Sequence, residues 1–225
     1  MGTLCLVRHG QASVGSEDYD RLSATGVRQC ELLGAYLHAR GRCFEAVLRG
    51  SLRRHQQSLA AIASALPGLP PEIEWPGLNE YDGEALVRAV RDIDRDPMPS
   101  PHTPDGYRQH FRVLREGLAQ WMAGQVQPSG MPSWPGFVAG VSNALDHVRS
   151  SFEGDVLMVS SGGPIATAVA QVLAAPPATV IELNLRLRNS ALTEFSFTPK
   201  RHMLLTFNTL PHLDAPEHAA LVSFA

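Results

Sequence analysis

The chain has few cysteines and no surplus of basic residues. Three cysteines occur in 225 residues, without Cys-x-x-Cys spacing, and this pattern argues against a disulfide framework or a cysteine-based metal or redox site. We interpret Cys5, Cys30 and Cys43 as small apolar residues of a protein in a reducing compartment. The formal net charge is -3, with both signs mixed along the sequence, so the extended basic surface that nucleic-acid binding requires is missing.

Long apolar runs are missing as well. No stretch approaches the roughly 20 residues that a helix needs to span a bilayer, and we recognise no signal peptide ahead of the first apolar segment. We therefore expect a cytoplasmic protein that binds neither membrane nor nucleic acid. With 44% hydrophobic residues, the chain is long enough for one well-buried domain and short for two, so we expect a single domain over residues 1–225.

Apolar runs and helical patterns alternate along most of the chain. Strands are expected over residues 3–7, 44–48, 156–160, 180–183, 191–197 and 202–207. Helices are expected over residues 25–40 (capped by Ser23), 52–66, 135–152 and 165–173. This alternation predicts an α/β fold, a three-layer α/β/α sandwich around a mostly parallel sheet.

Two segments depart from the alternation. Prolines and glycines interrupt residues 84–135, whose main expected element is a helix over residues 105–122, so we predict an insertion that leaves the sheet. The residues at the end of the chain, 208–225, have mixed polarity and are expected to form a loose tail.

The first strand is followed at once by Arg8-His9-Gly10. Ligands of open α/β sheets bind just beyond the carboxyl ends of strands, and a guanidinium there can grip two oxygens of a phosphoryl group. An imidazole beside fixed cations is disfavoured in its charged form, so His9 should stay neutral and able to attack phosphorus. The motif therefore predicts His9 as a nucleophile and Arg8 as a phosphate ligand.

Further segments carry a family pattern. They are LVRHGQAS at 6–13, DYDRLSATGVRQCELLG at 18–34, GSLRRHQQS at 50–58, LNEYDG at 78–83, VLMVSSGGPI at 156–165 and RNSALTEF at 188–195. Together these segments resemble the histidine phosphatase superfamily, in its phosphoglycerate-mutase-like branch. The resemblance implies that family's fold, with residues 84–135 as a helical lid that shapes substrate choice.

The resemblance also implies roles for two further side chains. Arg54 falls in the first turn of the second helix, where the helix N-terminus already favours anions, and is expected to bind phosphate. Glu80 falls where the family carries its proton donor, since a partly buried carboxylic acid can protonate a leaving oxygen. Asp82 is the nearest rival for that role, and Glu84 is a weaker one.

The fifth segment departs from the family. Where a second histidine usually follows the third strand and donates to the phosphoryl oxygens, this chain has Ser161. A serine hydroxyl keeps one hydrogen bond but no charge, and the change could cost about 10²–10³ in rate. The backbone amides of Gly162 and Gly163 could recover part of the loss.

Other histidines and polar residues are candidates for the same pocket. His55 follows Arg54, but successive helix residues point about 100° apart, so we expect it to face elsewhere. His102 and His110 of the lid could reach over the pocket, but each is expected at the surface. Gln11, with Ser13, could contact the anion where the family's asparagine is replaced by Gly15. Asn189 and Ser190 are expected to be structural, and the remaining histidines have no metal-site spacing, so neither a metal nor a cofactor is predicted.

Three functions remain open at this stage. The first is a phosphatase that hydrolyses phosphomonoesters, small molecules or phosphorylated side chains, through a phosphohistidine on His9. The second is a phosphoglycerate-mutase-type phosphotransferase, which the missing histidine and the proline-broken lid disfavour. The third is a phosphate-binding module of low activity, which Ser161 favours and the pairing of His9 with Glu80 disfavours. The sequence does not fix the oligomeric state.

Overall fold

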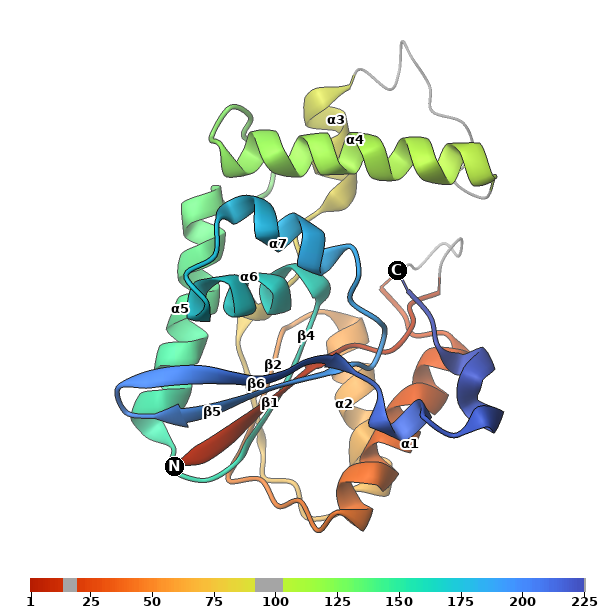
Figure 1. The fold of residues 1–225 in the computed structure, drawn as a ribbon, viewed down its shortest axis with the longest axis vertical. Helices are drawn as coiled ribbons and strands as arrows, with labels where there is room; N and C mark the ends of the chain where they lie inside the picture. Colours follow the sequence, from red (N-terminus) through yellow and green to blue (C-terminus); the bar gives the residue numbers. More distant parts are fainter. Residues whose placement is uncertain (14–19, 92–102, 225) are drawn as a thin grey trace.

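A six-stranded sheet forms the centre of the molecule in the computed structural model, which describes residues 1–13, 20–91 and 103–224 (Figure 1). The strands are β1 (Gly2–Arg8), β2 (Ala46–Arg49), β3 (Glu72–Glu74), β4 (Val156–Ser160), β5 (Leu192–Thr198) and β6 (Arg201–Thr209). They lie in the order β3-β2-β4-β1-β5-β6. β1 to β4 pair in parallel, and β5 and β6 complete the sheet in antiparallel pairings, so the predicted mostly parallel sheet is confirmed.

The strand registers bring distant parts of the sequence to one edge of the sheet. β1 pairs with β4 so that Arg8 lies opposite Ser160, and β2 pairs with the other side of β4 so that Arg49 lies opposite Val159. Carboxyl ends of parallel strands meet at the same edge. The residues that follow β1, β2 and β4 are therefore neighbours.

Alternating side chains of each strand enter two separate cores. Leu4 and Leu6 of β1 join the core under α5 (Trp134–Ser151), α6 (Gly162–Val172) and α7 (Pro177–Asn184). Cys5 and Val7 join a second core under α1 (Ala24–Ala39) and α2 (Arg53–Ala65). This alternation is the period of a strand covered on both faces, and it confirms the predicted three-layer α/β/α sandwich.

The insertion stands above the strand ends as a pair of helices, α3 (Gly83–Val90) and α4 (Pro104–Met122) (Figure 1). A short 3-10 turn, η1 (Pro76–Leu78), leads into it from β3. Trp121 of α4 is buried and packs edge to face against Phe137 of α5, and its indole N–H donates to the carbonyl of Pro132. The insertion is therefore anchored to the body of the protein through aromatic contacts at the end of α4. Within the described residues, no helix is long and apolar enough to cross a bilayer.

Two predicted elements are wrong. Residues 180–183 form part of helix α7 and not a strand, because Pro177 fits the first turn of a helix and the buried residues Val180, Ile181 and Asn184 lie at helical spacing, with Glu182 exposed. The end of the chain is not a loose tail. It folds into the 3-10 turns η2 (Pro211–Leu213) and η3 (Pro216–Leu221), and Gln29 of α1 donates its side-chain amide to the carbonyl of Leu221.

Candidate active site

His9 follows β1 and is held in the sheet through its backbone. Its N–H donates to the carbonyl of Ser160 (2.9 Å), and its carbonyl accepts from the N–H of Ser190 (3.1 Å). The ring atom Nδ1 lies 2.7 Å from the carbonyl oxygen of Gly10. A carbonyl can only accept, so Nδ1 carries the proton and Nε2 keeps a free lone pair.

The surroundings of His9 keep its ring neutral. Burial, followed by the charges of Arg8 and Arg54 and by His55, lowers the pKa of His9 well below the ordinary 6.5. His9 is 4% exposed. A neutral imidazole with an unprotonated Nε2 is the form that can act as a nucleophile.

Arg8 and Arg54, the two predicted phosphate ligands, lie at the same edge of the sheet, and both are buried. Arg8 donates to the carbonyl of Leu187. Arg54 lies in the first turn of α2 and donates to Oδ1 of Asp20 (2.7 Å). Both guanidinium groups lie close enough to His9 for their charges to lower the pKa of its ring.

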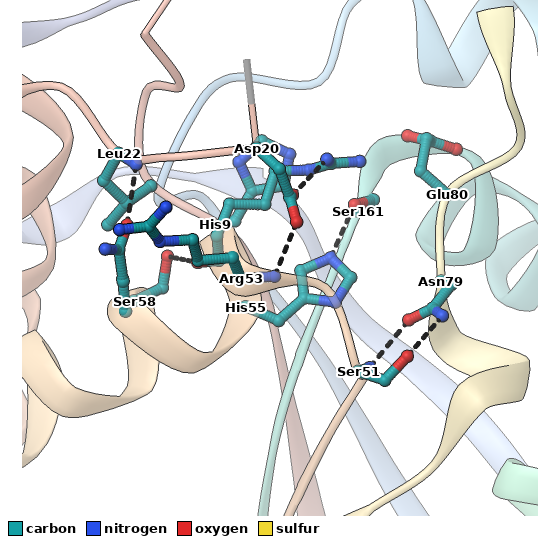
Figure 2. Close-up of polar contacts among 12 residues, drawn as sticks. His9, Asp20, Leu22, Ser51, Arg53, His55, Ser58, Asn79, Glu80 and Ser161 are labelled. Carbon is teal, nitrogen blue, oxygen red and sulfur yellow. Dashed lines mark hydrogen bonds and ion pairs between the residues drawn. The ribbon is translucent and has the colours of Figure 1, made fainter. Parts of the chain in front are cut away.

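Asp20 was not singled out by the sequence analysis. Its Oδ2 accepts from the backbone N–H of Arg53 (2.7 Å), so the carboxylate bridges the helix N-terminus and the Arg54 side chain (Figure 2). The N-cap residue of α2 is Leu52, which offers no side-chain acceptor. Asp20 therefore supplies from a distant loop the cap that the helix sequence lacks.

Ser58 of α2 ties the helix to the loop after β1. Its hydroxyl accepts from the N–H of Gly10 (3.0 Å) and donates to the carbonyl of Arg54 (2.7 Å). Gly10 lies against Gly26 of α1, where a Cβ atom would come within 2.3 Å of a carbonyl oxygen. The absence of a side chain at this position therefore allows α1, α2 and the His9 loop to meet.

Glu80 lies after η1 and contacts the N-terminus of α6. Its two carboxylate oxygens accept from the N–H of Gly163 (3.0 and 3.1 Å). Burial raises the pKa of Glu80, and this effect outweighs the N–H of Gly163 and the charges of Arg54 and Arg8, which act in the opposite direction. A carboxyl group in such surroundings can hold a proton and deliver it.

The rivals of Glu80 have other partners or positions. Asp82 is the N-cap of α3 and accepts from the N–H groups of Glu84 and Ala85. Glu84 is exposed in the first turn of that helix. Beside Glu80, Asn79 exchanges two hydrogen bonds of 2.7 Å with Ser51, which pins the Glu80 loop to the start of α2. Sequence reasoning missed Asn79, whose signal was its place next to the acid.

Ser161 begins the turn into α6, and its hydroxyl lies 2.7 Å from Nε2 of His55 (Figure 2). The expectation that His55 faces away is wrong. The 100° separation compares side chains around the helix axis, but the N-terminus of α2 points at the site, so neighbouring residues of its first turn both border it. His55 is fully buried, and burial, with Arg54 and Arg49, lowers its pKa to about 3.

The other sequence candidates lie as follows. The side-chain carbonyl of Gln11 accepts from the hydroxyl of Ser23 (2.9 Å), next to the cap of α1. Gly162 is buried at the start of α6, where a Cβ atom would lie 2.2 Å from Oδ1 of Asn184. The N–H of Gly163 is taken by Glu80, so the expectation that it binds phosphate is not supported. His110 packs on Phe111 in α4. His102 and Gly15 fall outside the described residues.

A second serine–histidine pair lies on the other side of the His9 loop. Ser190 has a left-handed backbone (φ 57°), and its hydroxyl lies 2.8 Å from Nε2 of the buried His212. Asn189 accepts from the hydroxyl of Ser223 (3.0 Å). These contacts join the strand end to the C-terminal segment. Over residues 1–13, 20–91 and 103–224, no cluster of three or more histidine, cysteine, aspartate or glutamate side chains could hold a metal ion.

Comparison with known proteins gives one family and a consistent fold. The model of the histidine phosphatase superfamily (branch 1) matches residues 4–210. A search of the curated proteins found no match.

Solved structures with this fold include three phosphatases. A putative alpha-ribazole-5'-P phosphatase from Escherichia coli aligns with a TM-score of 0.67 at 20% identity, over 92% of this chain and 96% of that one. A variant phosphoserine phosphatase from Entamoeba histolytica, in complex with phosphoserine, aligns at 0.64 and 19%, over 95% and 100%. A mycobacterial glucosyl-3-phosphoglycerate phosphatase aligns at 0.63 and 22%, over 93% and 99%.

Proposed function

Because the chain belongs to branch 1 of the histidine phosphatase superfamily, we propose that it hydrolyses phosphomonoesters through a phosphohistidine intermediate on His9. One observation carries the proposal. A neutral imidazole, with its Nδ1 proton held by the Gly10 carbonyl and Nε2 unprotonated, lies under the influence of two arginines. That combination prepares the ring to attack a phosphorus atom whose charge the arginines offset.

The first half of the reaction transfers the phosphoryl group. Arg8 and Arg54 bind its oxygens, with Ser161, Gly162 and Gln11 as further ligands. Nε2 of His9 forms a bond to phosphorus as the bond to the ester oxygen breaks, and Glu80 gives its proton to that oxygen. The raised pKa of Glu80 supports this role, since a larger fraction of the acid is protonated at a given pH.

The second half removes the phosphoryl group from His9. The Glu80 carboxylate accepts a proton from water as the water oxygen bonds to phosphorus, and the bond from phosphorus to Nε2 breaks. Inorganic phosphate leaves, and both side chains return to their starting forms. The ester and one water molecule are the only reactants that the two halves need in order to balance.

The substrate is a phosphate monoester, on a small molecule or on a side chain of another protein. The similar structures named above act on small phosphorylated compounds, which supports the first class. α3 begins three residues after Glu80, and with α4 it stands above the strand ends, so we assign the choice of leaving group to this insertion.

The test compares phosphate release by the native protein and by His9→Ala, with a generic aryl phosphate and a panel of cellular phosphomonoesters. We expect turnover by the native protein and none by the variant, with acid-labile, base-stable labelling of the native protein alone. His38→Ala, which removes an exposed histidine of α1, is the matched control and should keep full turnover. Equal turnover with and without His9 would refute the phosphohistidine route, and a folded native protein that binds phosphate without turnover would favour a binding module.

A further inference from the structure

We infer that His55 is a positioning residue for phosphoryl transfer, which fixes the Ser161 hydroxyl so that its hydrogen points at the transferring phosphoryl group. The inference rests on the proposed function and assigns a role to a side chain that the proposed reaction leaves unused. It also accounts for the serine at position 161, because the His55 imidazole contacts the Ser161 hydroxyl and lies one side chain farther from the phosphoryl group.

The backbone places Ser161 beside the nucleophile. Ser160 is the last residue of β4 and pairs with Arg8, so Ser161 and His9 follow neighbouring strands at the same level. The N–H of His9 donates to the carbonyl of Ser160, which fixes this relation. On its other side β4 pairs with β2, and the rings of His9 and His55 lie with centroids 5.8 Å apart. The His55–Ser161 pair therefore borders the place where a phosphoryl group meets His9.

The direction of the hydrogen bond follows from the partners of the His55 ring. The ring is neutral because its pKa is lowered to about 3, so it carries one N–H. Its Nδ1 faces the backbone of Gly50, which raises the pKa of the ring but forms no hydrogen bond of normal geometry with it. An N–H without a partner is the costlier state for a buried ring, so the hydrogen resides on Nε2 and is donated to Ser161. The single hydrogen of the serine is then left for another acceptor.

The chain makes room for this ring. A Cβ atom at position 50 would lie 2.2 Å from Nδ1 of His55, so only glycine allows the ring to occupy its place. Gly50 directly follows β2, and its N–H donates to the carbonyl of Val159 in β4. The ring is therefore held between the ends of two strands, and its orientation is set by packing as well as by the bond to Ser161.

A fixed hydroxyl is a better donor than a free one. An unanchored serine side chain divides its time among rotamers and can point its hydrogen in several directions. Ser161 and His55 both show no solvent exposure, so water does not compete for the hydrogen bond between them. A donor that is already oriented in a dry site needs no reorganisation when charge develops on the phosphoryl oxygens.

The experiment uses a matched pair of substitutions at position 55, each made with Ser161 present and with Ser161→Ala. His55→Gln keeps a side-chain amide that can donate to the hydroxyl, and His55→Leu has nearly the same size without a donor. We expect Ser161→Ala to lower kcat about 10²-fold. His55→Leu should lower it about tenfold and His55→Gln less than about threefold, with small changes in KM.

The double variants separate positioning from packing. If His55 acts through the serine, the Leu and Gln variants have equal kcat once Ser161 is alanine, because no hydroxyl remains to be oriented. Inhibition by vanadate, whose oxygens resemble those of the transferring group, should weaken with His55→Leu in the Ser161 protein and not change further in the Ser161→Ala protein. Thermal unfolding of each pair is measured alongside.

Two results would overturn the inference. Equal kcat for His55→Leu and His55→Gln with Ser161 present would show that only packing matters. A loss from His55→Leu that is the same with and without Ser161 would show that the ring does not act through the hydroxyl. Failure of the proposed function has a separate signature, since His9→Ala would then keep the native turnover.

Discussion

Two buried serine–histidine pairs flank the His9 loop, and they differ in almost nothing except their neighbours. The hydroxyl-to-Nε2 distance is 2.7 Å in the His55–Ser161 pair and 2.8 Å in the His212–Ser190 pair. All four side chains are buried, and the pKa of each histidine is lowered to about 3, with burial as the first cause.

The neighbours decide what each pair can do. Arg54 and Arg49 are the charged groups that act on His55, and the ring of His9 lies beside it. His212 is influenced by His218 instead, and Ala191, the residue after Ser190, belongs to a small apolar cluster with Leu210 and Leu213. A serine hydroxyl hydrogen-bonded to an imidazole is therefore not by itself evidence of a catalytic role. Its place relative to fixed cations and to the ring of His9 makes the difference.

The largest effect on kcat should come from substituting Glu80, the proposed proton donor, which accompanies the His55–Ser161 pair and not the His212–Ser190 pair. Glu80→Gln is expected to lower kcat for alkyl phosphates by about 10³, because the leaving alkoxide needs a proton. Aryl phosphates, whose leaving groups are stable anions, should lose far less. Steady-state kinetics with both ester classes measure the difference, and Glu84→Gln is the control with an unchanged rate. Equal losses for the two classes would exclude Glu80 as the proton donor.

The same acid sets the direction of the pH dependence. In the proposed reaction only protonated Glu80 can give a proton to the leaving oxygen, and its pKa is raised by burial, so kcat/KM should fall as the pH rises through that pKa. Protonation of His9 limits the acid side only well below pH 6.5, because its pKa is lowered. Glu80→Gln should abolish the basic limb and leave the acid limb in place.

The next largest effect separates the pairs by stability. His212→Leu leaves the buried Ser190 hydroxyl without its partner, which should lower the free energy of unfolding by about 2–3 kcal/mol and leave kcat within about twofold of the native value. Adding Ser190→Ala should recover part of that stability, since neither polar group then remains. Urea unfolding and turnover of the single and double variants test this. A large loss of kcat in folded His212→Leu would erase the contrast between the pairs.

Acid should affect the two pairs alike. Both histidines stay neutral in the folded protein down to about pH 3, whereas in the unfolded chain they bind protons near 6.5. The stability linked to these two neutral histidines is therefore fully present above pH 6.5. It decreases as the pH falls, by about 2 kcal/mol for each histidine at pH 5. Unfolding measured at pH 7 and pH 5 for His55→Leu and His212→Leu should show a smaller acid loss than in the native protein. An unchanged acid loss in either variant would mean that its histidine is charged when folded.

The smallest effect concerns the carboxylate that caps the helix carrying His55. Asp20→Asn keeps one acceptor but removes the charge that faces Arg54 and the N-terminus of α2, and should cost about 1 kcal/mol of stability. Asp105→Asn is the matched control, because Asp105 lies exposed in the first turn of α4 while Thr103 serves as the cap. Denaturant midpoints of the two variants give the comparison. Equal midpoints would show that the tertiary cap contributes nothing.

Much of the fold followed from local patterns. The alternation of apolar runs with helices gave the layers, and Ser23 is the observed N-cap of α1. The predicted strand at residues 180–183 failed because a short apolar run has no period that separates a strand from a buried helix turn. The prediction of a loose C-terminal tail failed for a different reason. Its order depends on contacts with Gln29 and Asn189, which are distant in sequence.

The residues of the candidate site likewise divide into those that a local motif predicts and those that it does not. His9, Arg8, Arg54 and Glu80 could be named because each follows a strand or begins a helix in a recognisable motif. Asp20, Asn79 and His55 could not, because their roles depend on which loops the sheet brings together. For His55, reasoning about the helix axis alone gave the wrong direction, since the geometry of the helix end matters more than the angle between successive side chains.

The register of β1 has a consequence for how the protein folds. Leu4 pairs with Val156, so the strand that leads to His9 finds its parallel partner more than 150 residues later in the chain. Contacts between such distant segments form late, because the loop that joins them must first be closed. His9 is synthesised before β4 and α6, yet its pocket is completed only after β4 and the turn to α6 are in place. Recovery of turnover during refolding should therefore report the last step of assembly, and intermediates with formed helices should be inactive.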